Sequence, residues 1–445
     1  MKISFIGAGS VGFTRKMVTD ILSVPALQNI EISLMDIDSA NLEMIYNVLS
    51  RDIKANNLGN VRLSKTTDRR ESLKGAKYIF SFIRVGGLDA FAMDIEIPMK
   101  YGVNQCVGDT LCAGGIMYGQ RTIPVMLDIC KDIREVSEPD ALFLNYSNPN
   151  TMNTWAANTY GAVQTLGLCH GVQHGHEQIA NVLGLPVSEV DIICAGINHQ
   201  TWYIQVLHQG KDMRGKLLEG FRKHPEYSKQ EKVRIDILER FGYYSTESNG
   251  HLSEYLAWYR KRPDGIDKWI DYSDWIHGEN GGYLRHCREL RSKFEEEARQ
   301  YETMDPAKYH TENRSTEHGS YIIEAIETGC IYRGHFNVIN RRAISNLPFD
   351  SVVELPGYAD RNGICVPIVG DLPFPCAAIC NQSIAVQRLA VEAAIEGNPQ
   401  KLKQAMLLDP LVGAVCTPPE VWAMTDEMLK AQEEWLPQYA KHSGH

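Results

Sequence analysis

The sequence predicts an α/β protein: a Rossmann-like, doubly wound parallel sheet followed by a mixed α+β domain. Three observations support this fold class. Apolar runs typical of strands alternate with amphipathic helical patterns through the first half of the chain. A glycine-rich turn follows the first of these runs. From about residue 196 the alternation stops, and strands and helices come in separate groups.

The first half begins with KISFIG, an apolar run that ends in glycine and is typical of a buried strand. FTRKMVTDILSV then has helical spacing, and IEISLMDID is a second strand that ends in acidic residues. NLEMIYNVLSRDIKAN is an amphipathic helix whose apolar face carries Leu42, Ile45, Val48 and Leu49. Further strands are predicted in AKYIFSFI, DALFLNYSN and VQTLGLCHG, with the helix GQRTIPVMLDICKDIREV between the first two. In such a βαβ arrangement, ligands bind at the carboxyl ends of the strands.

The second half has a different order. TWYIQVLHQGKDM predicts a strand with a turn, and helices follow in KQEKVRIDILERFG and GGYLRHCRELRSKFEEEARQYE. Residues 331–368 have a β-like pattern, and the chain closes with helices from NQSIAVQRLAVEAAI to EVWAMTDEMLKAQEEWL. We therefore predict a Rossmann-like domain over residues 1–195 and an α+β domain for substrate binding and oligomerisation over residues 196–445.

Composition excludes several classes of protein. The chain has 445 residues, 44% of them hydrophobic, and a formal charge of −10, which argues against nucleic acid as the main partner. It has no run of about 18 apolar residues, so no membrane span is expected. The N-terminus is better explained as a strand than as a signal peptide. Eleven cysteines without a CxxC pair favour reduced thiols and a cytoplasmic location.

A nucleotide site is predicted at the turn IGAGSVGF, where Gly7, Gly9 and Gly12 have G-x-G-x-x-G spacing. Gly7 permits the tight turn, Gly9 lets the backbone approach a diphosphate, and the following helix offers free N–H groups. An acid at the end of the second strand accepts hydrogen bonds from ribose and repels a 2′-phosphate, which favours NAD over NADP. The predicted cofactor-binding residues are Gly7, Ala8, Gly9, Ser10, Val11, Gly12, Asp36 and Asp38, with Arg84 and Gly86 of FIRVGG on the other side of the nucleotide.

Two candidate metal ligands follow apolar runs, Cys169 in TLGLCHG and His199 in AGINHQTW. Each has a structural alternative, because a cysteine in an apolar strand is ordinarily a small buried hydrophobe and a lone histidine is ordinarily hydrogen-bonded. No zinc-type spacing supports the pair. A thiolate with a neutral imidazole suits Mn²⁺, Fe²⁺ or Zn²⁺ comparably well. The residues alone leave both the metal and the structural interpretation open.

Eight ordered segments resemble glycoside hydrolase family 4, and within it the α-galactosidase (melibiase-type) branch. They are ISFIGAGS, LMDID, GDTLCAGGIMYGQRTIP, LNYSNPNTMNTWA, GLCHGVQ, CAGINHQTWY, GYYSTESNGHLSEYLAWY and WLP, and they run almost from end to end of the chain. The resemblance implies a lactate/malate dehydrogenase-like architecture. It also implies NAD⁺ and Mn²⁺ (or another divalent metal) as cofactors, a small oligosaccharide as substrate, and a homodimer or homotetramer.

The resemblance further implies hydrolysis by a redox route, an exception to the two-carboxylate mechanism of most glycosidases. NAD⁺ takes a hydride from C3 of the sugar, and a metal held by Cys169 and His199 stabilises the enediolate. A base removes the C2 proton and the glycosidic oxygen leaves from C1. Water then adds to the enone and NADH returns the hydride, with retention of configuration.

Acid and base roles are less sharply implied. Phospho-glycosidase branches of the family have an Asp after the metal-binding Cys, where this chain has His170. An imidazole donates a proton at neutral pH, so His170 is the candidate acid, with a structural histidine as the rival interpretation. The base is expected in YYSTESNGHLSEYLAWY, with Tyr244, Glu247 and His251 as candidates. Much of this run also fits a capped helix N-terminus.

Substrate contacts are implied at two places. Asn148 in NYSNPNT matches a family position that contacts sugar hydroxyls, although Asn-Pro also initiates turns. Asp109 and Thr110 lie in the glycine-rich loop VGDTLCAGG, which the family places near the sugar and the nicotinamide. Relatives often have LGPGG there, so Cys112 and Ala113 depart from the pattern.

The leading hypothesis is therefore an NAD⁺- and Mn²⁺-dependent α-galactosidase for melibiose- or raffinose-type substrates. The first alternative is the same chemistry on another α-glycoside, a glucoside or a galacturonide or glucuronide. The second is a plain NAD-dependent 2-hydroxy acid dehydrogenase, which would accumulate NADH and need no metal. The third is a non-catalytic NAD-sensing protein, in which Cys169 and His199 would be structural.

Overall fold

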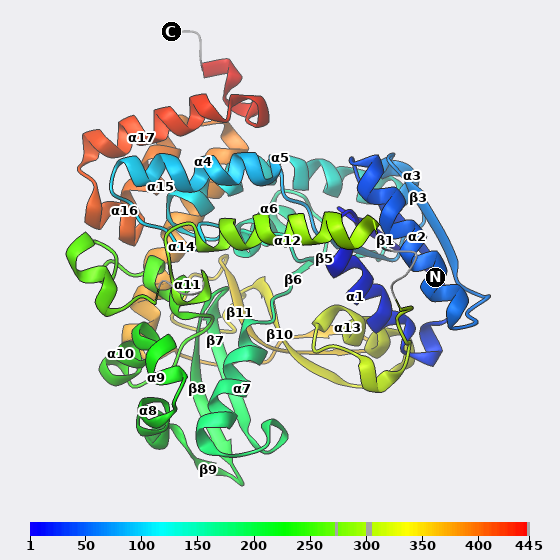
Figure 1. Ribbon diagram of the computed structural model, residues 1–445, viewed down its shortest axis with the longest axis horizontal. Coiled ribbons are helices and arrows are strands. Elements are labelled where there is room, and N and C mark those ends of the chain that lie inside the picture. Colours follow the sequence, from blue (N-terminus) through cyan, green and yellow to red (C-terminus); the bar gives the residue numbers. More distant parts are fainter. Residues whose placement is uncertain (272–274, 300–304, 443–445) are drawn as a thin grey trace.

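A computed structural model describes residues 1–271, 275–299 and 305–442 (Figure 1). Within these residues twelve strands form one sheet, in the order β3-β2-β1-β4-β5-β6-β10-β11-β7-β8-β9, with β12 paired to β11. The sheet has a parallel half and an antiparallel half, which meet where β10 pairs with β6. The predicted fold class is confirmed.

The parallel half contains the first six strands, in the order 3-2-1-4-5-6 that is typical of dinucleotide-binding folds. They are β1 (Lys2–Ile6), β2 (Glu31–Met35), β3 (Arg62–Thr66), β4 (Tyr78–Ser81), β5 (Leu142–Asn145) and β6 (Thr165–Gly167). The helices that connect these strands are α1 (Val11–Leu22), α2 (Ser39–Ala55), α3 (Arg69–Leu73), α4 (Gly87–Lys100), α5 (Cys112–Val136) and α6 (Asn150–Thr159).

Strand β3 was not predicted from the sequence, and its position explains why. It lies at the edge of the sheet, and its sequence RLSKT alternates exposed and half-buried side chains. An edge strand with basic residues has no apolar run to mark it. By contrast, the predicted apolar face of α2 is buried as expected.

The antiparallel half comes from the second part of the chain. It contains β7 (Asp191–Ile197), β8 (Gln200–His208), β9 (Lys211–Asp212), β10 (Tyr332–Ile339), β11 (Val352–Asp360) and β12 (Gly363–Cys365). The last three confirm the β-like region predicted over residues 331–368. The proposed boundary between residues 195 and 196 lies inside β7, so the division into two domains stays a prediction.

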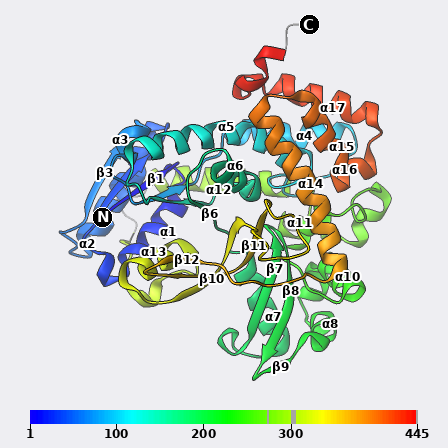
Figure 2. The ribbon, with the colours of Figure 1, turned by 180° about the vertical axis from the view of Figure 1, so that it is seen from behind.

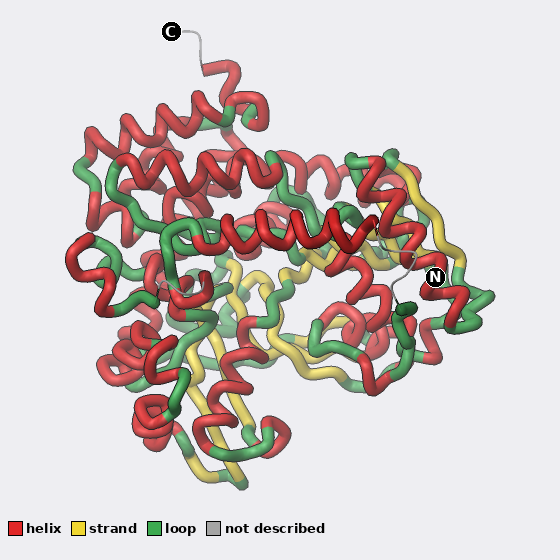
Figure 3. Tube along the Cα trace, in the orientation of Figure 1, coloured by secondary structure: helices red, strands yellow, loops and turns green. Residues whose placement is uncertain are grey.

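Helices surround the antiparallel half and build the C-terminal end. They are α7 (Gly171–Leu183), α8 (Arg214–Lys223), α9 (Tyr227–Gln230), α10 (Lys232–Phe241), α11 (Asn249–Tyr255), α12 (Gly282–Arg299), α13 (His318–Thr328), α14 (Phe374–Glu396), α15 (Pro399–Leu408), α16 (Pro410–Val415) and α17 (Pro418–Ala431). Figures 2 and 3 show α14–α17 at the opposite end of the molecule from β1–β3. The predicted helix over residues 281–302 is α12, and residues 300–302 of that prediction lie outside the described residues.

Short 3-10 helices complete the structure: η1 (Pro25–Leu27), η2 (Val187–Glu189), η3 (Pro263–Lys268), η4 (Trp275–His277), η5 (Thr311–Asn313), η6 (Glu433–Trp435) and η7 (Pro437–His442). Among the described helices, none is both long and apolar enough to cross a membrane.

Two large apolar clusters hold the sheet. One includes Phe5, Phe80 and Leu144 and lies around the parallel strands. The other packs α5 and α14 against β11 and includes fully buried Trp202. Burying one such side chain stabilises the fold by about 1.5–3 kcal/mol. The strand ends of the parallel half are thereby fixed relative to the β7–β8 turn.

Candidate active site

The glycine-rich turn between β1 and α1 needs glycine at two of its three glycine positions. Gly7 has φ +84°, and a Cβ there would lie 2.9 Å from the carbonyl carbon of Phe82. A Cβ on Gly9 would lie 2.7 Å from Asp36 Oδ2. Nothing lies within 4 Å of a Cβ built on Gly12, so this position is open rather than crowded.

Strand β2 holds the turn in place. The N–H groups of Gly7 and Ala8 donate to Met35 O at 3.0 and 2.9 Å, and the Gly9 N–H donates to Asp36 Oδ2 at 2.7 Å. Helix α1 begins after Ser10, whose side chain makes no capping bond. The N–H groups of its first turn therefore lack intrahelical partners, as a diphosphate site requires. Val11 is the first helical residue, but its side chain is outside the described part.

The two predicted acids have different partners. Asp36 is half-buried, and its Oδ1 also accepts the Asp38 N–H at 2.9 Å, so its carboxylate organises the turn. Asp38 is exposed and is the N-cap of α2, accepting the N–H groups of Ala40 and Asn41 at 2.9 and 3.0 Å. Asp38 Oδ1 thus caps α2, and the cofactor role of this residue stays a prediction.

The predicted residues of FIRVGG shape the turn from β4 to α4. The Arg84 guanidinium stacks over the rings of Phe91 and Tyr118, 4.6 and 4.9 Å from their centroids. Gly86 is the N-cap of α4 with φ +81°, and a Cβ there would lie 2.4 Å from Ala90 Cβ. The backbone conformation and the close contact with Ala90 thus require glycine at position 86.

Cys169 and His199 lie together, as their positions after apolar runs suggested. Cys169 follows β6, and His199 is in the two-residue turn between β7 and β8 with φ +63°. The Cys169 Sγ is 3.3 Å from His199 Nε2, and Glu247 Oε2 is 3.0 Å from the same nitrogen. One ligand atom from each of the three residues lies within 4.8 Å of the others. A thiol, an imidazole and a carboxylate in this arrangement fit one divalent metal ion.

A second group of possible ligands shares His199. Ligand atoms of Asp109, His199 and His251 also lie within 4.8 Å of one another, and the two imidazole rings are 4.6 Å apart. His251 Nε2 is 3.6 Å from Glu247 Oε2, and its Nδ1 is 2.7 Å from the Ser248 hydroxyl. His199 is therefore central to the cluster.

The electrostatics of the cluster favour a cation. Burial raises the pKa of the Cys169 thiol to about 11. Burial opposes protonation of His199, but Glu247 and Cys169 outweigh it and hold the pKa of His199 well above its usual range. Burial opposes ionisation of Glu247, but the imidazoles of His199 and His251 outweigh it and lower the pKa of Glu247 well below its usual range. A metal ion in place of the His199 proton would balance Glu247 and favour the thiolate.

The candidate acid His170 lies on the open side of the cluster. Its side chain is 59% exposed, and its Nε2 is 3.9 Å from Glu247 Oε1. Its Nδ1 is 3.7 Å from Glu317 Oε1, and Glu317 pairs with Lys16 of α1 at 3.1 Å. Sequence reasoning missed Glu317, because nothing in its own segment, STEHG, indicates that it lies near residue 170.

Tyr244 does not join the cluster. Its buried hydroxyl donates to Gln178 Oε1 at 2.9 Å, and its ring stacks on Phe221 with centroids 4.1 Å apart. Its candidacy as the base is therefore corrected, because its side chain points into the core around α7 and α8. Of the three base candidates, Glu247 and His251 remain.

The predicted substrate residues lie against the cluster. Asn148, after β5, donates to Asp109 Oδ2 at 2.7 Å. The Thr110 hydroxyl is 2.8 Å from Asp109 Oδ1 and 2.9 Å from His199 Nδ1. Asp109 thus belongs to the second group of possible ligands, Asn148 bonds to it, and Thr110 contacts both Asp109 and His199.

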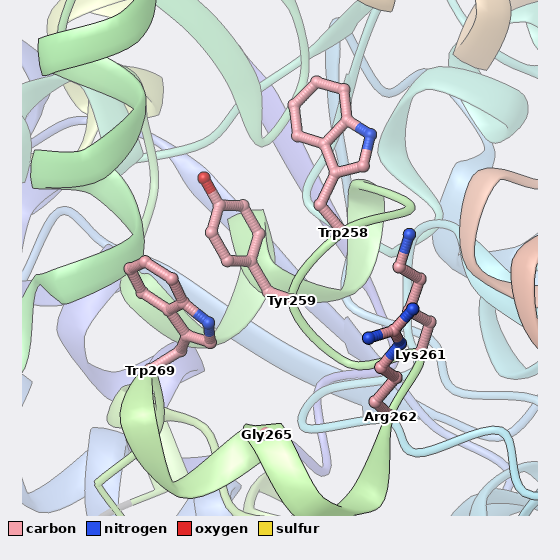
Figure 4. Close-up of a pocket in the computed structure, with 6 residues that line it drawn as sticks. All are labelled: Trp258, Tyr259, Lys261, Arg262, Gly265 and Trp269. Carbon is pink, nitrogen blue, oxygen red and sulfur yellow. The ribbon is translucent and has the colours of Figure 1, made fainter.

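A surface pocket of about 300 Å³ lies beyond α11, lined by Trp258, Tyr259, Lys261, Arg262, Gly265 and Trp269 (Figure 4). The Tyr259 hydroxyl donates to Asp236 and so belongs to the wall rather than to a free site. None of these lining residues is a predicted site residue. The candidate active site therefore remains the cluster around His199.

The fold and the site define a Rossmann-type protein that combines a glycine-rich turn of the dinucleotide-binding type with a cluster of side chains that could hold a metal ion. Residues 2–185 match the family model "Family 4 glycosyl hydrolase", and residues 194–412 match "Family 4 glycosyl hydrolase C-terminal domain". The chain belongs to glycoside hydrolase family 4, as the sequence segments indicated.

Similar proteins agree with this membership. An alpha-galactosidase of Rhizobium meliloti (strain 1021) is 60% identical over 99% of this chain and 90% of its own length. An alpha-galactosidase of Bacillus subtilis (strain 168) is 35% identical over 98% of this chain and 99% of its own length. A solved 6-phospho-alpha-glucosidase from gut microorganisms, in complex with NAD and glucose-6-phosphate, is 26% identical with a TM-score of 0.80, covering 98% of this chain and 99% of its own.

Proposed function

We propose that this protein is an NAD⁺- and Mn²⁺-dependent α-galactosidase that hydrolyses small α-galactosides of the melibiose or raffinose type with retention. The observation that carries the proposal is the cluster of Cys169, His199 and Glu247 in a fold with a dinucleotide-binding turn. The names of the two alpha-galactosidase relatives support the choice of sugar.

The residues that would hold the cofactors follow from the geometry. The turn at Gly7–Gly12 and the Asp36 carboxylate would bind NAD⁺, and Cys169, His199 and Glu247 would bind Mn²⁺. When bound, NAD⁺ supplies a reversible hydride acceptor, and Mn²⁺ supplies a Lewis acid for the sugar oxygens.

The remaining polar side chains would orient the sugar and move protons. Asp109 and Asn148, already joined by a hydrogen bond, would bind sugar hydroxyls. Ser248 orients His251 within the buried cluster, which suits removal of the C2 proton. His170 is the most exposed member and suits proton donation to the leaving oxygen.

Two variants separate the role of a metal ligand from that of the base. Glu247→Gln should lose Mn²⁺ binding. His251→Asn should retain Mn²⁺ binding and lose exchange of the substrate C2 proton with solvent.

The decisive experiment is hydrolysis of 4-nitrophenyl α-galactoside after removal of NAD⁺ and metal, with each added back alone and then both. We expect activity only when both are present. Hydrolysis that needs neither would replace the redox route with ordinary acid–base chemistry. Net accumulation of NADH on a 2-hydroxy acid, without hydrolysis, would establish the dehydrogenase alternative.

Sugar specificity separates the leading proposal from its closest alternative. Matched 4-nitrophenyl α-glucoside, α-galacturonide and α-glucuronide, assayed under the same conditions, should react more slowly than the galactoside. Equal rates on the galactoside and the glucoside would overturn the choice of galactose while leaving the family chemistry intact.

We also infer a homodimer or homotetramer, which the family resemblance supports, and a cytoplasmic location, which the cysteine content supports. Light scattering of the purified protein tests the first. Fractionation of the producing cells tests the second.

A further inference from the structure

An irregular loop between α4 and α5 carries two of the site residues. Residues 103–111 are all buried, although they form neither helix nor strand. Backbone N–H groups in such a segment must find partners, because water cannot reach them. The groups that supply those partners therefore decide where Asp109 and Thr110 lie.

Glu254 supplies two of these partners. Its Oε2 accepts the N–H of Val107 at 2.9 Å, and its Oε1 accepts the N–H of Gly108 at 3.0 Å. Glu254 is fully buried on α11, three residues after His251 and so on the same side of that helix. One short helix thus holds both a member of the cluster and the backbone directly before Asp109.

A carboxylate at this position is costly for the fold. Its two oxygens accept bonds from neutral backbone N–H groups, and an uncompensated buried charge costs several kcal/mol. The guanidinium of Arg260 acts on it only at longer range, since it binds Ser253, Asn104 and Gly278 instead. Burial raises the pKa of Glu254 to about 7. Packing alone does not require a carboxylate at this position, whereas the adjacent N–H groups of Val107 and Gly108 require hydrogen-bond acceptors.

A second buried carboxylate holds the far end of the loop. Asp409 Oδ2 accepts the N–H of Cys112 at 2.9 Å, and its Oδ1 accepts those of Leu411 and Val412 at 3.1 and 3.0 Å. Cys112 has φ +59°, a conformation that residues other than glycine rarely adopt. The loop is therefore fixed on both sides of Asp109 and Thr110.

The fixed loop controls the state of His199. The Thr110 hydroxyl has one proton, and it donates that proton to Asp109 Oδ1. The Thr110 hydroxyl oxygen must then accept the Nδ1–H of His199, at 2.9 Å. This bond keeps a proton on Nδ1, so Nε2, which lies 3.3 Å from Cys169 Sγ, is the nitrogen that would exchange its proton for a metal ion.

We propose that Glu254 is a positioning residue of the metal site: its carboxylate fixes the loop at residues 107–108 so that Thr110 orients His199 for metal binding. This inference rests on the proposed function, because it assigns the ion to the cluster of Cys169, His199 and Glu247. Hydrogen-bonding partners of metal ligands typically change metal affinity by about 10–100-fold when they are replaced.

The test is Glu254→Gln, measured by calorimetric titration of the metal-free protein with Mn²⁺ under reducing conditions and by kcat and KM. Glutamine keeps the size of the side chain, but its amide group would face one of the two loop N–H groups, donor against donor. We expect Mn²⁺ binding to weaken by about 10–100-fold, with much of kcat recovered at saturating Mn²⁺. If Glu254 were merely structural, Glu254→Gln would lower thermal stability without a selective loss of Mn²⁺ affinity.

Asp20→Asn is the matched control. Asp20 is a buried carboxylate of α1 that accepts the Ser315 N–H at 2.8 Å, and it belongs to neither the loop nor the cluster. Its variant should lose stability and keep the Mn²⁺ affinity. An equal loss of Mn²⁺ affinity in both variants would mean that general loosening of the fold, rather than the loop, controls the metal.

A double-mutant cycle with Thr110→Val tests the route. If Glu254 acts through Thr110, then Glu254→Gln should weaken Mn²⁺ binding little further in the Thr110→Val background. Independent, multiplying losses would overturn the route through His199. If Glu254→Gln does not fold, Glu254→Asp keeps both acceptor oxygens on a shorter arm and should still bind Mn²⁺ less tightly than the parent.

The outcomes separate the two proposals. A parent protein that does not bind Mn²⁺ contradicts the proposed function. A parent that binds Mn²⁺, with the same affinity in the Glu254→Gln variant or in a folded Glu254→Asp variant, overturns the positioning role alone.

Discussion

The nucleotide turn and the metal cluster differ in how the chain builds them. Gly9 and Asp36, which hydrogen-bond to each other, are 27 residues apart and belong to one βαβ unit. The cluster instead joins residues 109, 169, 199, 247 and 251, and four of these come after β6, the last parallel strand. The turn is therefore encoded locally, whereas the cluster depends on how the two halves of the sheet meet. Mutations should therefore have larger effects in the cluster than in the turn.

The largest effect should come from the cluster. Cys169→Ser removes the proposed thiolate ligand and should lower kcat/KM by at least about 10³-fold. The reason is that the Lewis acid contributes several kcal/mol of stabilisation, and about 1.36 kcal/mol corresponds to a factor of ten in rate. Hydrolysis and Mn²⁺ titration measure it. Cys130→Ser, at a buried cysteine of α5 outside the cluster, should retain activity. Full activity of the Cys169 variant would show that the pair is structural.

The second-largest effect concerns Asp409, whose carboxylate holds the loop that carries Asp109 and Thr110. Burial raises the pKa of Asp409 from an ordinary 3.8 to about 6, and no charged group is among the causes of this shift. Between these pH values the folded protein keeps a proton that the unfolded chain has lost, so stability must fall as pH rises. The loss is about 2 kcal/mol from pH 4 to pH 6 and about 3 kcal/mol over the whole titration, with a plateau above about pH 7.

Denaturant unfolding of the parent and Asp409→Asn over this pH range measures the effect. The stability of the parent relative to the variant should decline as pH rises, because titrations common to both proteins cancel in the difference. A difference that stays flat with pH would mean that Asp409 keeps an ordinary pKa.

The contrast between the regions also explains which parts the sequence could predict. The parallel sheet and its turn follow from apolar runs and glycines, and Cys169 and His199 stand out because each follows such a run. The choice between Tyr244 and Glu247 could not be made in this way. Their segment runs beside β8, with Tyr203 N–H bonded to Tyr244 O and Thr246 N–H bonded to Thr201 O. That non-local pairing directs Tyr244 into the core and leaves Glu247 beside His199.

Glu254 illustrates a signal that was present in the sequence. It lies three residues after His251 in a predicted helix, and this spacing places both side chains on one side of a helix. What the sequence lacks is the loop that Glu254 holds, since Val107 and Gly108 are nearly 150 residues earlier in the chain, separated by 147 and 146 positions. Long-range partners of buried backbone leave no local pattern.

In the locally encoded region, Asp36→Ala should weaken NAD⁺ binding by about 10–100-fold. The substitution would remove one charged hydrogen bond to the ribose, worth about 1.5–3 kcal/mol, and it also leaves the Gly9 N–H without its acceptor. Titration of NAD⁺ in the absence of substrate measures the change, and kcat at saturating NAD⁺ should be largely retained. An unchanged dissociation constant would remove Asp36 from the nucleotide site.

The smallest effect should come from Asp38→Ala, two residues away. Because Asp38 caps α2 through the N–H groups of Ala40 and Asn41, its loss should cost about 1 kcal/mol of unfolding free energy. NAD⁺ affinity should stay within twofold of the parent, since the Asp36 carboxylate and the glycine turn are intact. Thermal unfolding and NAD⁺ titration of both variants separate the two acids. If Asp38→Ala weakened NAD⁺ binding as much as Asp36→Ala, the acids would act as one unit, and the turn would depend on α2 as strongly as the cluster depends on its distant supports.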